Sequence, residues 1–466
     1  MSIKKRIGLA ALLVSCLAGC GSRLPEYTAP EAPAVSTLAP VGSACLGLSY
    51  DGEKAVTEAV LESYASEDGC CVIEKKESYY EVYLDFTRAD HHTVGYTYAK
   101  MVKDLGVEEV LEPYLHENIL HAFPNLNGDY APVEKRIREL LENLPEDYRE
   151  EIEGFAEGIS EGRKGIEPDE KLSYEEGLLA HLVGECLRPT NCNASAVWGE
   201  KSLSGERMLS RTMDWSLGSS NQMCTAHAVT HFINGEGKNS YTAFSVLGML
   251  DILTAINDKE VFAGPLDAGT GALYTSEGKK CYTFELRYAL ENMSDARSIG
   301  EYMVSESKNF TFSHNIFVSD RDHTFVAEDS VYGDEYYSGK STLRDADTPL
   351  LDGLVWDNPD CLCAVNSFVT EGSEDSITFS SSNYVRFCKY NKWFSEKEKL
   401  SFGDLKGIVT NEKPEYDSQA QKIYGDIAYE VIVYDYATGE LQAVLTGVDG
   451  IVGHPDFIKI ESPWKR

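Results

Sequence analysis

The amino-acid sequence predicts an α+β fold built on antiparallel sheets. Before about residue 190, apolar residues recur at spacings of three and four, the pattern of amphipathic helices. After that point the pattern changes to short alternating segments separated by turn residues, which predicts strands. Helices and strands are grouped along the chain, whereas parallel sheets need them to alternate one by one. The grouping therefore favours antiparallel pairing.

Four helices are expected in the first half, at residues 92–105, 133–144, 146–159 and 174–187. Ser173 and the acidic residues Glu175 and Glu176 predict an N-cap and first turn for the last of these helices. The expected strands are residues 194–198, 207–213, 226–232, 241–247, 315–318, 430–434 and 441–446. Two further helices are expected at residues 295–305 and 384–394.

Length and composition limit the classes of protein that fit this sequence. With 466 residues and 42% hydrophobic content, the chain can form one large or two medium domains with a substantial core. The counts of 38 glycines and 16 prolines exclude a collagen-like or globally disordered chain. A net charge of −34 would repel phosphate backbones, so we expect no nucleic-acid partner.

The first twenty residues have the features of an export signal. Three basic residues at positions 4–6 precede an apolar run at 7–17, which is too short to span a bilayer comfortably. Residues 17–20 read Leu-Ala-Gly-Cys and resemble the bacterial lipobox, in which the signal is cut before a lipidated cysteine, here Cys20. An ordinary signal peptide with a chance cysteine is the alternative.

The expected organisation follows from this signal. Residues 1–19 form the lipoprotein signal peptide, and the proline-rich residues 20–46 form an extended tether. No later stretch is long and apolar enough for a second membrane span. We therefore expect a globular body held by a lipid anchor on the extracytoplasmic face of the cell membrane.

The twelve cysteines do not give a metal or disulfide pattern. Export permits disulfides, but Cys70 and Cys71 are adjacent, and Cys361 and Cys363 are too close for an easy bridge. Neither pair has a second Cys or His pair at finger-like spacing. We predict no metal and no cofactor.

One cysteine stands out at the point where helices give way to strands. Cys192 follows Asn191 and precedes a predicted strand, and Arg211 and Asp214 come one hairpin later. An arginine stabilises a thiolate, and an aspartate can orient an amine or a thiol. Taken alone, the pattern also fits a structural cysteine beside an ion pair between Arg211 and Asp214.

This segment resembles the nucleophile region of the linear-amide group of N-terminal-nucleophile hydrolases. The group includes choloylglycine hydrolases, penicillin V acylases, acid ceramidase and the isopenicillin-N acyltransferase-like family. Its members share an N-terminal Cys, a hairpin, and Arg-x-x-Asp followed by an aromatic residue. In this sequence the corresponding residues are Cys192, Arg211, Asp214 and Trp215.

Further blocks follow in the order seen in this group, so that the resemblance covers roughly residues 88–400. Downstream, a turn with Asn257, an oxyanion-hole block with Asn366 and a late-helix block with Arg386 lie in residues 248–259, 364–368 and 381–387. Residues 90–95, 151–158 and 313–315 resemble the acyltransferase-like branch in particular.

The resemblance implies a four-layer αββα sandwich matured by a cut between Asn191 and Cys192. Residues 47–191 would be a mainly helical pro-region or alpha chain, and residues 192–466 the catalytic beta chain, with the two chains remaining associated. The freed α-amine has a reference pKa of about 7.7–8.0 and can act as the base for the thiol. Arg211 would favour the thiolate, Asp214 would hold the amine, and Arg386 would anchor the site.

Three departures from the family pattern affect the oxyanion hole and the cut. The chain reads Cys192-Asn193-Ala194 where the family usually has Thr after the Cys, and Asn191 stands where Gly is common. Asn366 would donate to the oxyanion, but Asp267 occupies the position of a second donor, ten residues after Asn257. An ionised carboxylate there would oppose an oxyanion. Either the oxyanion hole is weakened, or Asp267 contacts substrate or is misaligned, and we favour the last two readings. Asn193 can donate through its backbone N–H, and Asn257 is a further candidate.

The expected function is an exported, lipid-anchored amidase that hydrolyses a linear, non-peptide C–N bond of an acylated small molecule. The alternatives are acyl transfer between amines and a ligand-binding lipoprotein whose site has decayed. At single positions, Arg386 also fits a surface helix residue and Asn366 a turn residue.

Overall fold

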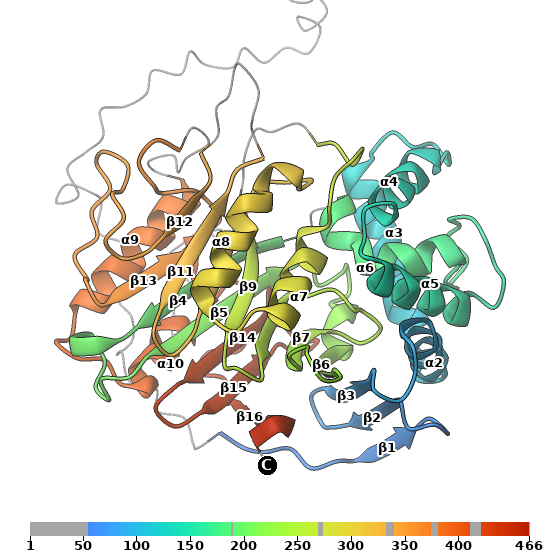
Figure 1. Cartoon of the computed structure of the whole chain (residues 1–466), viewed down its shortest axis with the longest axis horizontal. Coiled ribbons are helices and arrows are strands. Elements are labelled where there is room, and N and C mark those ends of the chain that lie inside the picture. Colours follow the sequence, from blue (N-terminus) through green and yellow to red (C-terminus); the bar gives the residue numbers. More distant parts are fainter. Residues whose placement is uncertain are drawn as a thin grey trace, which may run out of the picture. The chain divides into compact units, whose positions relative to one another are not determined.

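The computed structural model describes residues 55–187, 190–268, 274–331, 340–373, 381–410 and 421–465. Within them, two β-sheets stack face to face and helices cover both outer faces (Figure 1). The fold is therefore α+β with four layers in the order αββα, as the resemblance implied. The signal, the tether and Cys20 lie outside the described residues. No helix in the described part is long and apolar enough to cross a membrane.

The larger sheet has ten strands, and all its pairs but one are antiparallel. The exception joins β3 to β6 in parallel and connects the N-terminal strands to the rest of the sheet. In sheet order the strands are β1 (Glu62–Ala65), β2 (Cys71–Lys75), β3 (Tyr80–Asp85), β6 (His227–Ile233), β7 (Tyr241–Val246), β8 (Thr254–Asn257), β9 (Phe262–Asp267), β10 (His314–Ser319), β11 (Thr324–Asp329) and β12 (Thr342–Arg344).

The smaller sheet has six antiparallel strands and carries the cysteine of interest. In sheet order the strands are β13 (Cys361–Ala364), β4 (Thr190–Val197), β5 (Met208–Trp215), β14 (Ala428–Asp435), β15 (Glu440–Leu445) and β16 (Ile458–Ile460). The strand predicted at 194–198 begins at Thr190, so Cys192 lies inside β4 and not at its start.

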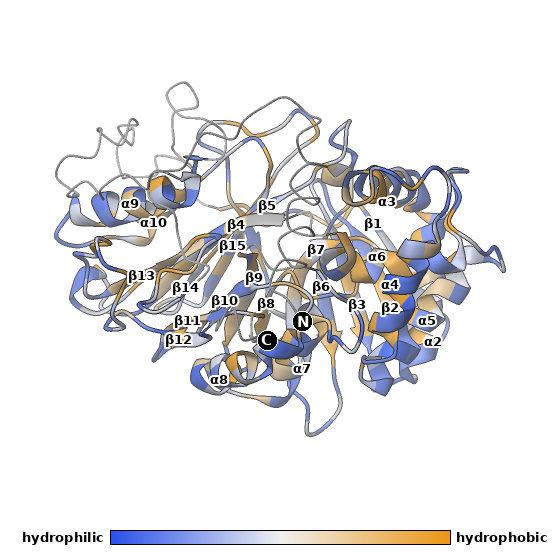
Figure 2. Cartoon of the chain, turned by 90° about the horizontal axis from the view of Figure 1, so that it is seen from above, coloured by the Kyte–Doolittle hydropathy of each residue, from blue (hydrophilic) through white to orange (hydrophobic). Residues whose placement is uncertain are grey.

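Seven of the described helices lie on the side of the larger sheet: α2 (His91–Asp104), α3 (Glu108–Ala122), α4 (Ala131–Leu141), α5 (Glu146–Ser160), α6 (Tyr174–Leu187), α7 (Tyr282–Asn292) and α8 (Ala296–Glu306). Helices α9 (Ser382–Ser395) and α10 (Phe402–Thr410) contact the smaller sheet instead. Hydrophobic residues gather on the strands and on the helix sides that face them, and hydrophilic residues lie outside (Figure 2). The core is therefore continuous across the layers.

The sequence patterns located the predicted helices and strands to within a few residues, but several elements were missed. Three strands, β1 to β3, precede the helices of region 47–191 and were not predicted. Helix α3 was missed because Pro113 interrupts its pattern and because its buried positions include Glu108, Glu112 and His116. A helix that buries polar residues lacks the apolar stripe on which periodicity depends.

Helices α2 and α5 cross at glycine positions. A Cβ at Gly95 would lie 1.9 Å from the Glu151 carbonyl oxygen, and one at Gly154 would lie 2.2 Å from that of His92. Any other residue would therefore force the two backbones apart. The Glu-x-x-Gly-x-Ala-x-Gly block at residues 151–158 thus has a packing role in this fold.

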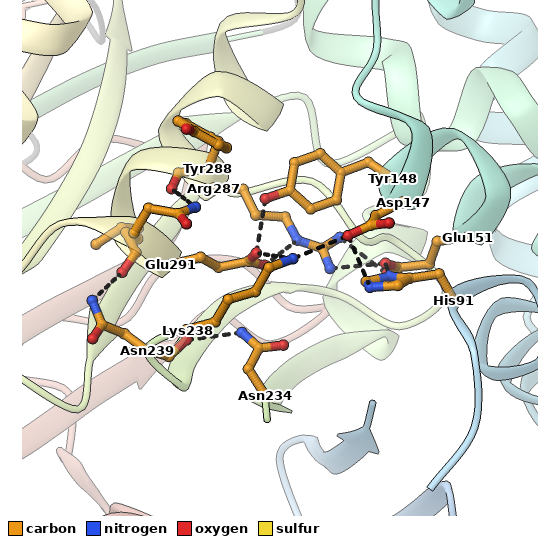
Figure 3. Close-up of polar contacts among 12 residues, drawn as sticks. His91, Asp147, Tyr148, Glu151, Asn234, Lys238, Asn239, Arg287, Tyr288 and Glu291 are labelled. Carbon is orange, nitrogen blue, oxygen red and sulfur yellow. Dashed lines mark hydrogen bonds and ion pairs between the residues drawn. The ribbon is translucent and has the colours of Figure 1, made fainter. Parts of the chain in front are cut away.

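Arg287 lies fully buried at the centre of a charged cluster that joins the helices to each other (Figure 3). Its guanidinium donates to both carboxylate oxygens of Glu151, at 3.0 and 2.8 Å, and to Glu291 at 3.1 Å. Tyr148 donates to Glu291 at 2.8 Å, and the His91 ring is 3.0 Å from Glu151. The cluster therefore connects α2, α5 and α7 through one cation.

Candidate active site

The register of the β4–β5 hairpin decides which side chains can meet. Cys192 pairs with Met213, and Ala194 pairs with Arg211. Residues opposite each other in an antiparallel pair share a face, and faces alternate along each strand. Cys192 and Arg211 therefore share the inner face, toward the larger sheet, while Asp214 faces outward toward α9. Opposite faces exclude the alternative of an Arg211–Asp214 ion pair.

On the inner face, Arg211 holds its guanidinium beside the Cys192 thiol. Its Nη2 lies 3.5 Å from the Cys192 Sγ and donates to the Pro265 carbonyl of β9 at 2.7 Å. Its Nη1 donates to the Thr254 hydroxyl of β8 at 2.5 Å. A Cβ at Gly264 would lie 2.4 Å from the Arg211 Nε, so β9 needs glycine there to admit the guanidinium.

Burial controls the protonation of Cys192 in this chain. The residue is 1% exposed, and burial raises the pKa of its thiol to about 11, even though Arg211 acts to lower it. Asp214 raises the pKa further. Arg211 thus acts in the direction expected from the sequence, but desolvation outweighs it and the thiol is protonated near neutral pH.

On the outer face, Arg386 of α9 reaches into the sheet. It is fully buried, so the reading as a surface helix residue is wrong. Its Nη1 donates to the Cys192 carbonyl at 3.1 Å and lies 3.6 Å from the Asp214 carboxylate. Its Nη2 donates to Asn366 at 2.8 Å and to Asn383 at 2.6 Å. Arg386 therefore holds the Cys192 backbone from the outer face.

Asn366 follows β13 and bonds to both sheets. Its Oδ1 accepts the backbone N–H of Cys192 at 2.8 Å, and its Nδ2 donates to the Asp267 carbonyl at 2.6 Å. A residue with only a turn role would not bridge Cys192 and the end of β9. A cut before Cys192 would turn that same nitrogen into the α-amine, already next to Asn366.

The remaining sequence candidates divide into two groups. The Asp267 backbone joins the site through Asn366, and Asp267 is the one residue of β9 that is only partly buried. Asn257 is not brought to Cys192: its side chain accepts from the Val261 N–H at 2.9 Å and donates to the Leu290 carbonyl at 3.0 Å. The backbone of Asn191 pairs with Asp214.

Asn193 stands where the resemblance led us to expect Thr, and its side chain makes two hydrogen bonds that account for an asparagine at this position. Its side-chain carbonyl accepts the Tyr390 hydroxyl of α9 at 2.5 Å, and its amide donates to the Ile423 carbonyl at 2.9 Å. The side chain is fully buried on the outer face, away from the thiol. The departure from Thr therefore fits a packing contact between β4 and α9.

Sequence reasoning missed Glu430 and Thr254 in the neighbourhood of Arg211. The Glu430 carboxyl lies 3.8 Å from the Arg211 Nη1. The Thr254 hydroxyl donates to this carboxyl at 2.8 Å. Glu430 is the first residue of a predicted strand, and no sequence signal indicates that it points inward. Among the described residues, no group of three or more His, Cys, Asp and Glu side chains is arranged to hold a metal.

Comparisons with known proteins give similarity at the level of structure alone. No known family profile matches the sequence, and no curated protein matches it. An N-acylethanolamine-hydrolyzing acid amidase ortholog from Caenorhabditis elegans is similar with a TM-score of 0.35 and 12% identity, over 53% of this chain and 96% of that chain. A variant of conjugated bile acid hydrolase from Clostridium perfringens has a TM-score of 0.34 and 12% identity, over 58% and 97%. Penicillin V acylase from Agrobacterium tumefaciens has a TM-score of 0.32 and 11% identity, over 55% and 83%.

Proposed function

We propose that the protein is an amidase that hydrolyses a linear, non-peptide C–N bond of an acylated small molecule, with Cys192 as nucleophile. The observation that carries this proposal is the set of contacts around one residue. Arg211 lies beside the Cys192 thiol, while Asn366 and Arg386 bond its backbone N–H and carbonyl. A residue that supplies both the nucleophile and the base needs its thiol and its backbone nitrogen fixed in position relative to each other.

In the proposed maturation, the Cys192 thiol attacks the carbonyl carbon of Asn191. The C–N bond to Cys192 breaks as a thioester forms, and the nitrogen takes up the proton that the thiol loses. Water then hydrolyses the thioester, which releases the Asn191 carboxylate and frees both the thiol and the α-amine. The amine is left where the Cys192 N–H now bonds Asn366, on the strand that Asp214 flanks.

In the proposed reaction, the free α-amine takes the thiol proton and the thiolate attacks the amide carbonyl of the substrate. Arg211 stabilises the thiolate electrostatically, and the Asn366 amide is a donor for the oxygen that becomes negative. The leaving amine receives the proton from the Cys192 α-amine as the C–N bond breaks. Water then attacks the thioester, so that the acid is released and the thiol is restored.

The two chains are expected to stay together after the cut. Strand β3 pairs with β6 inside the larger sheet, and Arg287 of α7 bonds Glu151 of α5. These contacts cross the proposed cleavage point and do not depend on the bond before Cys192. The mature protein would therefore be a complex of alpha and beta chains.

The proposal is tested with the purified protein, intact-mass measurement and a panel of acyl amides. We expect two noncovalently associated chains, the second beginning at Cys192, and release of the free amine from at least one class of acyl amide. A peptide of matched size should remain uncut. A single chain that stays intact and hydrolyses no amide would favour the ligand-binding alternative.

We further propose that the protein is anchored through Cys20, on the support of the basic, apolar and lipobox-like segments at residues 1–20. The variant Cys20→Ser should leave the protein unprocessed or release it from membranes. Fractionation and the mass of the N-terminal peptide measure this outcome. A processed variant that still sediments with membranes would contradict the anchor.

A further inference from the structure

Arg211 has a second buried partner besides Cys192. Glu430 on β14 is 1% exposed, and its Oε1 lies 3.8 Å from the Arg211 Nη1. The Thr254 hydroxyl accepts from Arg211 at 2.5 Å and donates to Glu430 at 2.8 Å. A three-residue link therefore runs from the carboxyl of Glu430 through Thr254 to the guanidinium that touches the thiol.

A β-bulge at Tyr429 directs Glu430 into the space between the sheets. Ala428 pairs with Asp214 and Glu430 with Met213, so Tyr429 is the extra residue. Tyr429 stacks on His227 of β6 at 4.0 Å, and Glu430 contacts Thr254 of β8, so both point toward the larger sheet. Without the bulge, strand alternation would place Glu430 on the same outer face as Ala428.

The register places Arg211 between two groups that compete for its charge. Cys192, Met213 and Glu430 form one row across β4, β5 and β14 on the inner face. The Arg211 guanidinium lies against this row, with the thiol 3.5 Å from Nη2 and the carboxyl 3.8 Å from Nη1. A negative charge on the Glu430 carboxyl therefore weakens the electrostatic stabilisation that Arg211 gives to a Cys192 thiolate, and the reverse also holds.

We propose that Glu430 is a positioning residue that holds Arg211 through Thr254 and sets how strongly Arg211 stabilises the Cys192 thiolate. The role of this thiolate in amide hydrolysis rests on the proposed function, whereas the coupling between Glu430 and the thiol does not. Glu430 touches no substrate in this scheme and acts through Arg211.

The charge of Glu430 changes in the neutral range. Burial raises the pKa of its carboxyl to about 7, against the lowering effects of Arg211 and of the Thr254 hydrogen bond. Below pH 7 the carboxyl is neutral and the whole charge of Arg211 faces the thiol. Above pH 7 the carboxylate neutralises Arg211 in part, and the thiolate becomes harder to form.

The other charged and titratable groups around this link come from few elements. Asp214 of β5 and Arg386 of α9 act on the thiol from the outer face. Tyr429 lies next to Glu430 on β14. From the larger sheet, β8 and β9 contribute uncharged contacts, the Thr254 hydroxyl and the Pro265 carbonyl. Glu430 is therefore the acid that faces Arg211 directly.

The test compares alkylation of Cys192 by iodoacetamide in the wild type and in Glu430→Gln, from pH 6 to 9, with peptide mass spectrometry as readout. Gln retains an acceptor for Thr254 and removes the charge. The two rates should coincide at pH 6, where the Glu430 carboxyl of the wild type is neutral, as the glutamine of the variant is at every pH. At pH 8 the variant should react about tenfold faster, the effect of one unit in the pKa of the thiol.

Two controls keep the comparison specific. Cys224, in the short helix η4 (Gln222–Thr225), has a thiol whose pKa burial also raises to about 11, and its rate should not change. Glu440→Gln removes a carboxylate of β15 that bonds Gln442, and should leave the Cys192 profile unchanged. Superimposed wild-type and Glu430→Gln profiles at every pH would overturn the proposal.

A second measurement decides the matter if the reagent does not reach the thiol. The infrared carbonyl band of protonated Glu430 is identified by its absence from the Glu430→Gln variant. The pH at which half of this band is lost measures the pKa of Glu430, which depends on its contacts with Thr254 and Arg211. Thr254→Val, of nearly equal size, removes the hydrogen bond that favours the carboxylate and should move this midpoint upward. An unmoved midpoint would overturn the link. Neither measurement uses a substrate, so failure of the amidase proposal would be seen separately.

Discussion

Replacing Cys192 with alanine should abolish both the cut after Asn191 and the hydrolysis of acyl amides. One thiol performs both attacks, and Arg211 cannot supply a nucleophile in its place. Loss of a catalytic nucleophile costs on the order of 10⁶ in kcat in a well-studied hydrolase, and we expect a loss of similar order here. Intact-mass measurement follows the cut, and amine release follows hydrolysis.

Two further variants make this result specific to one thiol. Cys192→Ser keeps a weaker nucleophile, so slow cleavage with little hydrolysis is expected. Cys224→Ala removes another buried thiol on a different element, the short helix η4, and should preserve both reactions. Full activity in the Cys192→Ala variant would exclude the assignment of the nucleophile.

Replacing Arg287 with methionine should destabilise the fold by about 3–5 kcal/mol, the usual cost of breaking a buried charge pair from one side. The change leaves Glu151 and Glu291 buried without the guanidinium that donates to both. Arg287 also links α5 to α7 and thus the two proposed chains. Urea denaturation followed by circular dichroism gives the free energy of unfolding.

A matched arginine on the next helix serves as control. Arg297 of α8 pairs with Glu301 at 3.7 Å with both side chains more than half exposed, so Arg297→Met should cost about 1 kcal/mol or less. Adding Glu151→Gln to the Arg287→Met variant should recover part of the loss, because one unpaired charge disappears. Equal losses for Arg287→Met and Arg297→Met would contradict the role given to the cluster.

Local patterns in the sequence were sufficient for the α+β class, for six of the nine described α-helices and for seven of the sixteen described strands. Amphipathic spacing located α5 and α6, and alternation located β7 and β14, because a half-buried element repeats its apolar residues with its own geometric period. The same reasoning failed for α3, whose buried side includes glutamates and a histidine. Periodicity cannot indicate a buried face when polar residues occupy it.

The sequence by itself also identified Cys192, Arg211, Asp214, Asn366 and Arg386 as a group, through short blocks in a known order. Only the tertiary structure decided how they meet. Register places Cys192 and Arg211 on one face of the smaller sheet and Asp214 on the other. Burial raises the pKa of Cys192 despite Arg211, and Asn366 bonds both Cys192 and the Asp267 carbonyl. These properties depend on which strands pair and how deeply a group is desolvated, and both join residues far apart in the chain.

Glu430 shows this limit most clearly. Its position in the sequence is that of an ordinary strand residue, and one extra residue in the pairing of β14 with β5 turns it toward Arg211. A bulge is a property of two strands together, and these two lie more than two hundred residues apart in the sequence. The sequence therefore predicted part of the secondary structure and the residues around Cys192, while the pairing of distant strands decided which charges act on the thiol.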